Sequence, residues 1–285
     1  MLLTAGALRV APLQGEMTLS FLGRIADGYG LTVRSLLSSV TEVAGQQGVV
    51  GALQGDSEVF LNAAARDRVA ALCRVPHVGL RRALPTWTRE EPPGPSKERP
   101  TARFRNGVET VAAWGPACPG CVAARTGRVA PARVYLAAHQ RVCPRHRCWL
   151  MGVPGIEGRV VGLAGCPEVV QAQADHRRLM RRSPVAASAF QVAEAVTAWW
   201  WAQVWPEERL WAMRLEAAMP AGEDPQRWRI LARDLVTYPE TVALAALLAS
   251  RVWRLRVAAG GGGHLPYRLA DVPCVPSELG GTLGS

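Results

Sequence analysis

Long apolar runs are missing from this chain. The longest candidate, residues 242–249, is far shorter than the roughly 20 residues that a helix needs to cross a bilayer. The first residues are briefly apolar but lack a basic stretch and a longer apolar stretch, so we expect no signal peptide. Both absences predict a protein that works in the cytoplasm without a membrane partner, where free cysteines stay reduced.

Motifs of common catalytic chemistry are also lacking. The chain contains neither a glycine-rich phosphate-binding loop ending in Gly-Lys-Ser/Thr nor a His-Glu-x-x-His zinc-protease motif. Cleavage of a phosphodiester needs clustered carboxylates or histidines that hold a metal and activate water. Acidic residues are spaced apart where the chain is most basic. We therefore expect that the protein is not an enzyme.

Lysine is almost absent, since Lys97 is the only one, yet the formal net charge is +10. A GC-rich genome would favour arginine codons everywhere, but the charge is uneven. Residues 66–149 hold 15 arginines and Lys97 against five acidic residues, an excess of 11, so this segment carries the whole net charge. Arginine contacts phosphate through two N–H groups at once. The uneven charge therefore predicts contact with nucleic acid.

Cysteine is present in a spacing that is typical of zinc sites. Cys118 and Cys121 form one pair, and Cys143 and His146 form a second pair 22 residues later. Four such donors can surround one Zn²⁺ tetrahedrally and leave no position for water, which indicates a structural ion. Each pair is expected at the tip of a tight turn. A redox pair would need a neighbouring βαβ pattern, and a disulfide would need an oxidising compartment. If one of the four zinc ligands is assigned wrongly, Cys148 and His139 are the nearest substitutes.

Two helix pairs are predicted in the first 90 residues. Thr18 or Ser20 can cap a first helix, and Thr32 can cap a second one beyond a glycine turn at Gly28 and Gly30. Asn62 can cap a third helix that runs to residue 73, followed by a short one to residue 84. Residues 24–37 and 71–84 align without gaps as a weak repeat. Each pair is either a helix-turn-helix unit or ordinary helical packing with solvated arginines.

The remaining chain is expected to be mostly helical. Residues 85–100 are rich in proline and indicate a linker. Residues 128–142 are ambiguous between a hairpin and a short helix. Helices are predicted over 166–182, 184–205, 207–219, 224–238 and 240–257. Three consecutive tryptophans, at 199–201, lie about 100° apart on a helix, so at least one should be exposed as a partner contact.

These patterns predict a mainly α protein in four parts. The expected parts are N-terminal helix-turn-helix units over 1–90, a small zinc-ribbon-like module over 101–165, a C-terminal helical bundle over 166–258, and a disordered tail over 259–285. The predicted nucleic-acid contacts are Arg34, Arg81, Arg82, Arg103, Arg105, Arg141, Arg145 and Arg147.

Two stretches resemble the TniQ family of transposition proteins. PLQGEMTLSFLGRIADGYGLTVRSLL (12–37) is similar to the opening of that family, and CPGC (118–121) with CPRHRCWL (143–150) is similar to its zinc knuckles. A second pair of cysteines often follows in the family, but here Cys166 stands alone. The resemblance covers residues 10–150 and implies one Zn²⁺ held by Cys118, Cys121, Cys143 and His146.

The resemblance further implies an accessory protein of DNA transposition. TniQ proteins combine helix-turn-helix units with zinc modules and connect a target-recognition element to the transposon's AAA+ ATPase. The implied partners are therefore DNA or a nucleoprotein complex and that ATPase or a target-recognition protein, and a homodimer is compatible with these roles. The alternative is a zinc-containing helix-turn-helix transcriptional regulator that binds DNA alone. A regulator should prefer a sequence by itself, whereas an adaptor should bind weakly until its partner is added.

Overall fold

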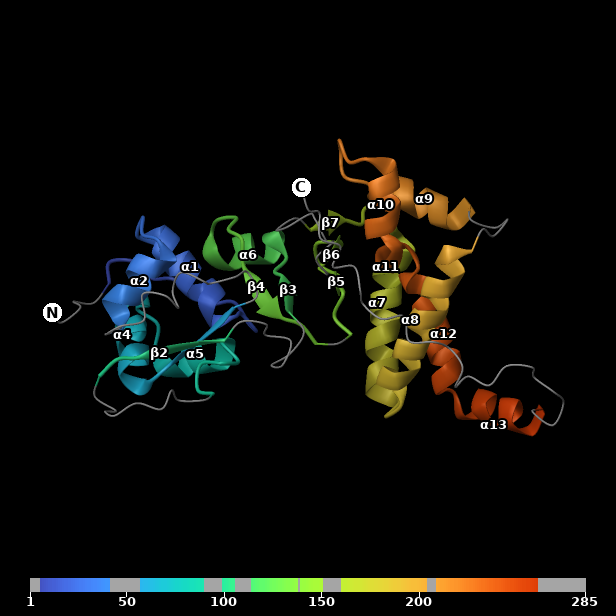
Figure 1. Cartoon of the computed structure of the whole chain (residues 1–285), viewed down its shortest axis with the longest axis horizontal. Helices are drawn as coiled ribbons and strands as arrows, with labels where there is room; N and C mark the ends of the chain where they lie inside the picture. The colour runs from blue at the N-terminus through green and yellow to red at the C-terminus, as the bar shows by residue number, and fades with distance from the viewer. Residues whose placement is uncertain are drawn as a thin grey trace, which may run out of the picture.

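The computed structural model describes residues 6–41, 57–89, 99–105, 114–137, 139–150, 160–203 and 209–260. The described part is mainly helical with short strands, as predicted. In Figure 1 helices α1, α2, α4 and α5 lie at one end together with β2, which pairs with β1. Strands β3 to β7 and helix α6 occupy the middle, and helices α7 to α13 lie at the other end. The region that resembles a zinc module therefore sits between two helical regions.

The helices are α1 (Thr18–Gly28), α2 (Val33–Val40), α4 (Ala63–Cys73), α5 (His77–Ala83), α6 (Pro119–Thr126), α7 (Pro167–Arg182), α8 (Ala186–Ala202), α9 (Arg209–Ala218), α10 (Pro225–Leu231), α11 (Arg233–Val236), α12 (Tyr238–Ala249) and α13 (Arg251–Gly260). The strands are β1 (Glu58–Leu61), β2 (Ala102–Arg105), β3 (Trp114–Pro116), β4 (Arg133–Tyr135), β5 (Val142–Cys143), β6 (Cys148–Trp149) and β7 (Val161–Gly162).

Two predicted caps of the N-terminal helices are confirmed. The Thr32 side chain accepts a hydrogen bond from the backbone N–H of Ser35 at the start of α2. The Asn62 side chain accepts one from Ala65 at the start of α4. Each oxygen satisfies a backbone donor that has no partner inside its own helix. Both caps could be predicted because donor and acceptor are three residues apart.

The two helix pairs repeat, but the predicted register is wrong by three residues. The gapless alignment places Gly30 on His77. In the structure the residue in the left-handed region of each turn is Gly30, with φ 66°, and Arg74, with φ 54°, 44 positions later. The first residues of α2 and α5, Val33 and His77, are also 44 positions apart. Buried core positions match in this register: Ile25 with Val69, Ala26 with Ala70, and Leu36 with Leu80.

The turn before α1 is held by a buried ion pair. Gly15, with φ 78°, lets the chain reverse so that Glu16 faces inward. The Glu16 carboxylate accepts from the Leu13 backbone N–H at 2.9 Å and from the Arg24 guanidinium at 2.6 and 2.7 Å. The side chains of Glu16 and Arg24 are 0% and 4% exposed, so each charge depends on the other. The Gly-Glu pair of the sequence motif thus shapes this turn.

The prediction that Thr18 or Ser20 caps α1 is wrong. The capping residue is Met17, whose side chain makes no capping hydrogen bond. The carboxylate of Glu58, in β1, instead accepts from the backbone N–H groups of Thr18 at 3.1 Å and Leu19 at 2.9 Å. A negative charge at this position also complements the partial positive charge of a helix N-terminus. The cap comes from 40 residues away, which a local motif cannot reveal.

Glu58 connects this cap to the middle of the chain. Its carboxylate also accepts from the Thr86 hydroxyl at 3.0 Å and from the Tyr135 hydroxyl, in β4, at 2.8 Å. A further bond comes from the Val59 backbone N–H at 2.8 Å. The side chain of Glu58 is fully buried, and its hydrogen bonds replace the water that it lost. One carboxylate therefore joins α1, the segment after α5 and β4.

Within the described residues, the strands form three small antiparallel sheets. β1 pairs with β2, β3 pairs with β4, and β5, β6 and β7 follow one another in the third sheet. Residues 128–142 were ambiguous between a hairpin and a helix, and their described part contains β4 and the start of β5 and no helix. β4 does not pair with β5, however. Its partner is β3, which comes before α6 in the chain.

Helices α7 to α13 follow the third sheet in the described part of the chain, and two predicted helices are split. The segment predicted over 166–182 corresponds to α7. The segment over 224–238 is divided between α10 and α11, and that over 240–257 between α12 and α13, with extended backbone at Ser250. A core that includes Phe190, Trp228 and Tyr238 lies among these helices. Trp199 is 59% exposed, which confirms that the three tryptophans do not all face inward.

The division into four parts stays a prediction. Hydrophobic side chains gather in one cluster among α1 to α5 and β1, and in another among β5 to β7 and the helices after them. The predicted linker falls mostly on residues 90–98, and the tail largely on 261–285, and both stretches lie outside the described residues. Within the described part, every helix is too short or too polar to cross a membrane.

Candidate metal centre

The first pair of candidate ligands lies at the start of a helix. Cys118 is the N-cap of α6, Pro119 occupies its first turn and Cys121 follows on the same turn. Proline suits this position because its fixed φ matches the helix and its missing N–H needs no partner. The prediction of a tight turn is therefore corrected to a helical turn. The sequence signal was present, since Pro119 suits a first helical turn and residues 121–126 contain no breaker before Gly127.

The second pair lies on the hairpin between β5 and β6. Cys143 ends β5 and pairs with Cys148, the first residue of β6. His146 lies in the turn between them, which closes with Arg147 in the left-handed region at φ 45°. Short reverse turns of this kind place two side chains on one side of the chain. Here the prediction of a tight turn agrees with the structure.

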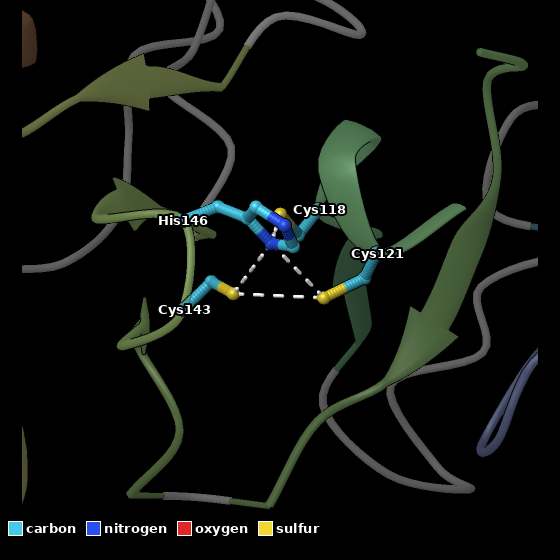
Figure 2. A group of neighbouring side chains, drawn as sticks. All are labelled: Cys118, Cys121, Cys143 and His146. Atoms are coloured by element: carbon cyan, nitrogen blue, oxygen red, sulfur yellow. Dashed lines mark hydrogen bonds between the residues drawn. The ribbon is translucent and has the colours of Figure 1, made fainter. Parts of the chain in front are cut away.

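The four side chains converge on one point, as Figure 2 shows. The Nδ1 atom of His146 lies 3.3 Å from the Sγ atoms of Cys118 and Cys121 and 3.6 Å from that of Cys143. The Cys121 and Cys143 Sγ atoms are 3.7 Å apart, and all four ligand atoms lie within 4.8 Å of one another. A tetrahedral Zn²⁺ site would separate two sulfurs by about 3.8 Å and a sulfur and a nitrogen by about 3.6 Å. The arrangement fits one metal ion.

Gly120 makes room for the histidine ring. A Cβ atom at this position would lie 2.5 Å from Cδ2 of His146, closer than real side chains approach. The imidazole therefore lies directly against the backbone of the first pair. The sequence contains a signal for this contact, since glycine stands between the two cysteines, but the contact itself depends on the fold.

The neighbouring sulfurs shift the pKa values of Cys121 and Cys118 in opposite directions. The pKa of the Cys121 thiol is raised to about 12, first by burial and then by the neighbouring sulfurs of Cys143 and Cys118. Burial also raises the pKa of Cys118, but hydrogen bonds from the backbone of Cys121, from the Cys148 and Cys143 thiols and from the backbone of Gly120 outweigh it and leave that pKa lowered. Three thiolates at this spacing need a cation. Metal binding should therefore release protons, and affinity should rise with pH.

The two substitute ligands have other contacts. Cys148 is buried, and its Sγ lies 3.5 Å from that of Cys118, to which it can donate a hydrogen bond. The His139 ring instead meets the ring of His176 edge-on at 6.2 Å. Among the described residues, Cys118, Cys121, Cys143 and His146 form the group close enough to share an ion. Cys166 is buried against the carbonyl of Arg214, so the described part offers no second site of this kind.

The predicted DNA-contacting arginines whose side chains are described are either used internally or exposed. Arg141 is used internally: its guanidinium pairs with Glu194 at 3.0 Å and lies 4.9 Å from the centre of the Phe190 ring. The side chain of Arg105 lies outside the described part. The others are exposed on α2, on α5, on β2 or in the β5–β6 turn: Arg34, Arg81, Arg82, Arg103, Arg145 and Arg147.

Comparison with protein families gives one match. The family model described as TniQ matches residues 7–150, about half of the chain. The match spans both helix pairs, the three sheets up to β6 and all four ligands. No curated protein and no solved structure matches the chain. The helices after residue 166 therefore lie outside the matched region.

Proposed function

Because the chain belongs to the TniQ family, we propose that it is a zinc-stabilised DNA-binding adaptor that connects target recognition to the ATPase of a transposon. Family membership supports a role in transposition and an association with DNA. The observation that carries the proposal is that one family match contains both the helix pairs and the ligand cluster.

The proposed ion is a single structural Zn²⁺. Three thiolates and one imidazole are a donor set that zinc prefers, and the sulfur and nitrogen spacings suit its tetrahedral bond lengths. Four protein ligands complete the coordination shell and leave no position for a reacting water. The role of the ion is therefore to hold α6 against the β5–β6 hairpin, and the adaptor performs no catalysis of its own.

DNA is contacted through exposed arginines of the helix pairs and the hairpin. In this proposal α2 and α5 are the second helices of two helix-turn-helix units, which supports assigning phosphate contacts to Arg34 and Arg81. Arg103 and Arg147 extend the basic surface to β2 and the β5–β6 turn. Such contacts give affinity with little sequence preference, which suits an adaptor that depends on a partner for its target.

A titration of labelled duplex DNA at several salt concentrations tests the DNA-binding role. Binding should weaken steeply as salt rises, because phosphate contacts release counterions. Metal analysis of the same sample should find one zinc per chain. A flat salt dependence or a metal-free, folded protein would contradict the proposal. Strong preference for one sequence by the protein alone would favour the transcriptional regulator instead.

A further inference from the structure

A groove of about 860 Å³ lies beside the ligand cluster. Its walls come from the segment before α1, from α5 and the residues before it, from α6, and from the stretch between β4 and the β5–β6 turn. Cys121 and Cys143 are among the lining residues, so the candidate metal centre forms part of one wall. The volume is in the range of binding sites rather than of surface irregularities.

Four arginines from four different segments line this groove. They are Arg9, Arg82, Arg125 and Arg145, and all four are exposed. None of the described lining residues is acidic, and no ion pair joins these arginines to a described carboxylate. Arg9 and Arg125 were not among the predicted contacts, because neither lies in a motif and only the fold brings them to the groove. A site with this charge favours a ligand with several negative groups.

The lining between the arginines is apolar. Leu13, Val122, Leu136 and Leu150 are buried side chains that face the groove. No aromatic residue occurs among the described lining residues, so the groove offers no ring on which a nucleic-acid base could stack. A DNA backbone would place its sugars and phosphates against aliphatic side chains, which cannot form hydrogen bonds with them. Apolar lining with positive edges instead matches a peptide that carries apolar and acidic side chains.

We propose that this groove binds an extended acidic segment of a partner protein, in which leucine-like residues alternate with Asp or Glu. The apolar side chains enter the groove, and the carboxylates meet Arg9, Arg82, Arg125 and Arg145 at its edges. This inference rests on the proposed adaptor function, because an adaptor needs a protein partner as well as DNA. It assigns the two tasks to neighbouring arginines: Arg82 to the partner and Arg81 to DNA.

Arg81 and Arg82 provide a matched comparison on one helix. Arg82 lines the groove, whereas Arg81 lines a separate pocket with Asp67 and Trp87. The β5–β6 turn offers the same contrast, since Arg145 lines the groove and Arg147 does not. The double variants R82E/R145E and R81E/R147E therefore change the net charge equally, from the same two elements. Any general electrostatic effect is common to both.

The test uses the full chain with its metal and two fluorescent probes. One probe is a peptide in which Leu alternates with Asp and Glu, and the other is duplex DNA of arbitrary sequence. R82E/R145E should weaken peptide binding about tenfold, since two exposed charge pairs become repulsive, and R81E/R147E should change it less than about twofold. DNA binding should show the opposite ranking. A lysine-containing version of the peptide should not bind the wild-type protein.

Three results would overturn the inference. The first is that the acidic peptide does not bind the wild-type protein, and the second is that both double variants weaken peptide binding equally. The third is that R82E/R145E reduces DNA binding more than peptide binding, which would make the groove a DNA site. Circular dichroism and zinc content establish that each variant is folded, and R9E/R125E replaces R82E/R145E if that variant is not. Failure of the proposed function would give a different result: the wild-type protein would not bind DNA, whether or not it binds the peptide.

Discussion

The candidate metal region and the C-terminal helices are stabilised in different ways. Around the ligands, the buried apolar groups are small clusters that include Leu136 and Leu150 in one and Leu13 and Val122 in the other. The C-terminal core instead contains Trp149, Trp228 and Tyr238 among its many members. A short segment cannot bury enough apolar surface to offset its loss of conformational entropy. The ion should therefore contribute strongly to the stability of the metal region and hardly at all to that of the C-terminal helices.

Removal of one ligand should have the largest effect. Cys121→Ser leaves three donors, so the protein should lose its metal, and α6 and the turn between β5 and β6 should unfold, a local loss above about 4 kcal/mol. Zinc content and hydrogen exchange of these elements measure the outcome. Amides of α7, α8 and α12 should remain protected, because burial rather than the ion orders them.

Cys148→Ser is the control for that variant. Its sulfur also lies within hydrogen-bond distance of Cys118, at 3.5 Å, but it is outside the four ligands. A hydroxyl can still donate to the Cys118 thiolate, so this variant should keep its zinc. Full zinc content in Cys121→Ser would show that the ligand assignment is wrong.

Glu58→Gln tests whether a polar network can matter as much as burial where the N-terminal helices meet β4. The carboxylate accepts five hydrogen bonds, and an amide would turn an NH₂ group toward some of those donors. We expect a loss of about 2–3 kcal/mol and faster exchange of the first amides of α1. Glu216→Gln, at an exposed position of α9, is the matched control and should be neutral. Equal stability of the two variants would refute the role of Glu58.

Gly120→Ala should weaken metal binding without preventing it. The added Cβ would meet the His146 ring at 2.5 Å and displace that ligand. We expect zinc affinity to fall about tenfold, as when the support of a ligand is disturbed. Competition with a chromophoric chelator measures the change. Gly162→Ala is the control, because nothing lies within 4 Å of a Cβ there, and an equal loss in both would contradict the contact.

Acid should destabilise the C-terminal helices through one buried histidine. Burial, followed by the charges of Arg141 and His139, lowers the pKa of His176 to about 4. In the unfolded chain His176 is protonated near its ordinary pKa of about 6.5. Its contribution to the free energy of unfolding should therefore be fully present above that pH and should decline as the pH falls toward 4. His176→Phe keeps a ring against Phe190, stacked at 4.0 Å, and should flatten this part of the pH profile.

Urea unfolding of the C-terminal region, followed by hydrogen exchange of α7 and α8, measures this profile. The wild-type protein and the variant share all other titrating groups, so their difference isolates His176. Identical slopes between pH 6.5 and 4 would exclude a contribution from this histidine. Protonation of the thiolate ligands also destabilises the metal region in acid, and for that reason the two regions must be followed separately.

Local patterns predicted local structure well. Thr32 and Asn62 were identified as caps because a cap needs only an oxygen three residues before its donor. The glycine turn expected at Gly28 and Gly30 is present, and Gly30 adopts the left-handed region because glycine tolerates positive φ. The predicted helix at 166–182 also agrees with α7. The repeat was found but misaligned, because Arg74 occupies the left-handed position where a glycine would have marked it.

Long-range contacts account for what the sequence did not reveal. The α1 cap comes from Glu58 rather than from Thr18 or Ser20. Arg141, whose contact with nucleic acid stays a prediction, pairs with Glu194, more than 50 residues later. From the sequence alone, an arginine is predicted to contact nucleic acid because of its neighbours in the chain, and Arg141 lies beside the zinc motif. Its internal contacts depend on where α8 packs, which no spacing reveals.

Residue types and short spacings were enough to identify the four candidate ligands, the two caps and the basic segment, because soft donors, capping oxygens and charge act over short separations. The folded arrangement was needed to see that Glu58 caps α1, that Gly120 lies against His146, and that four arginines meet around an apolar groove. These contacts join residues that are distant in the chain, and their geometry follows from how the helices and sheets pack.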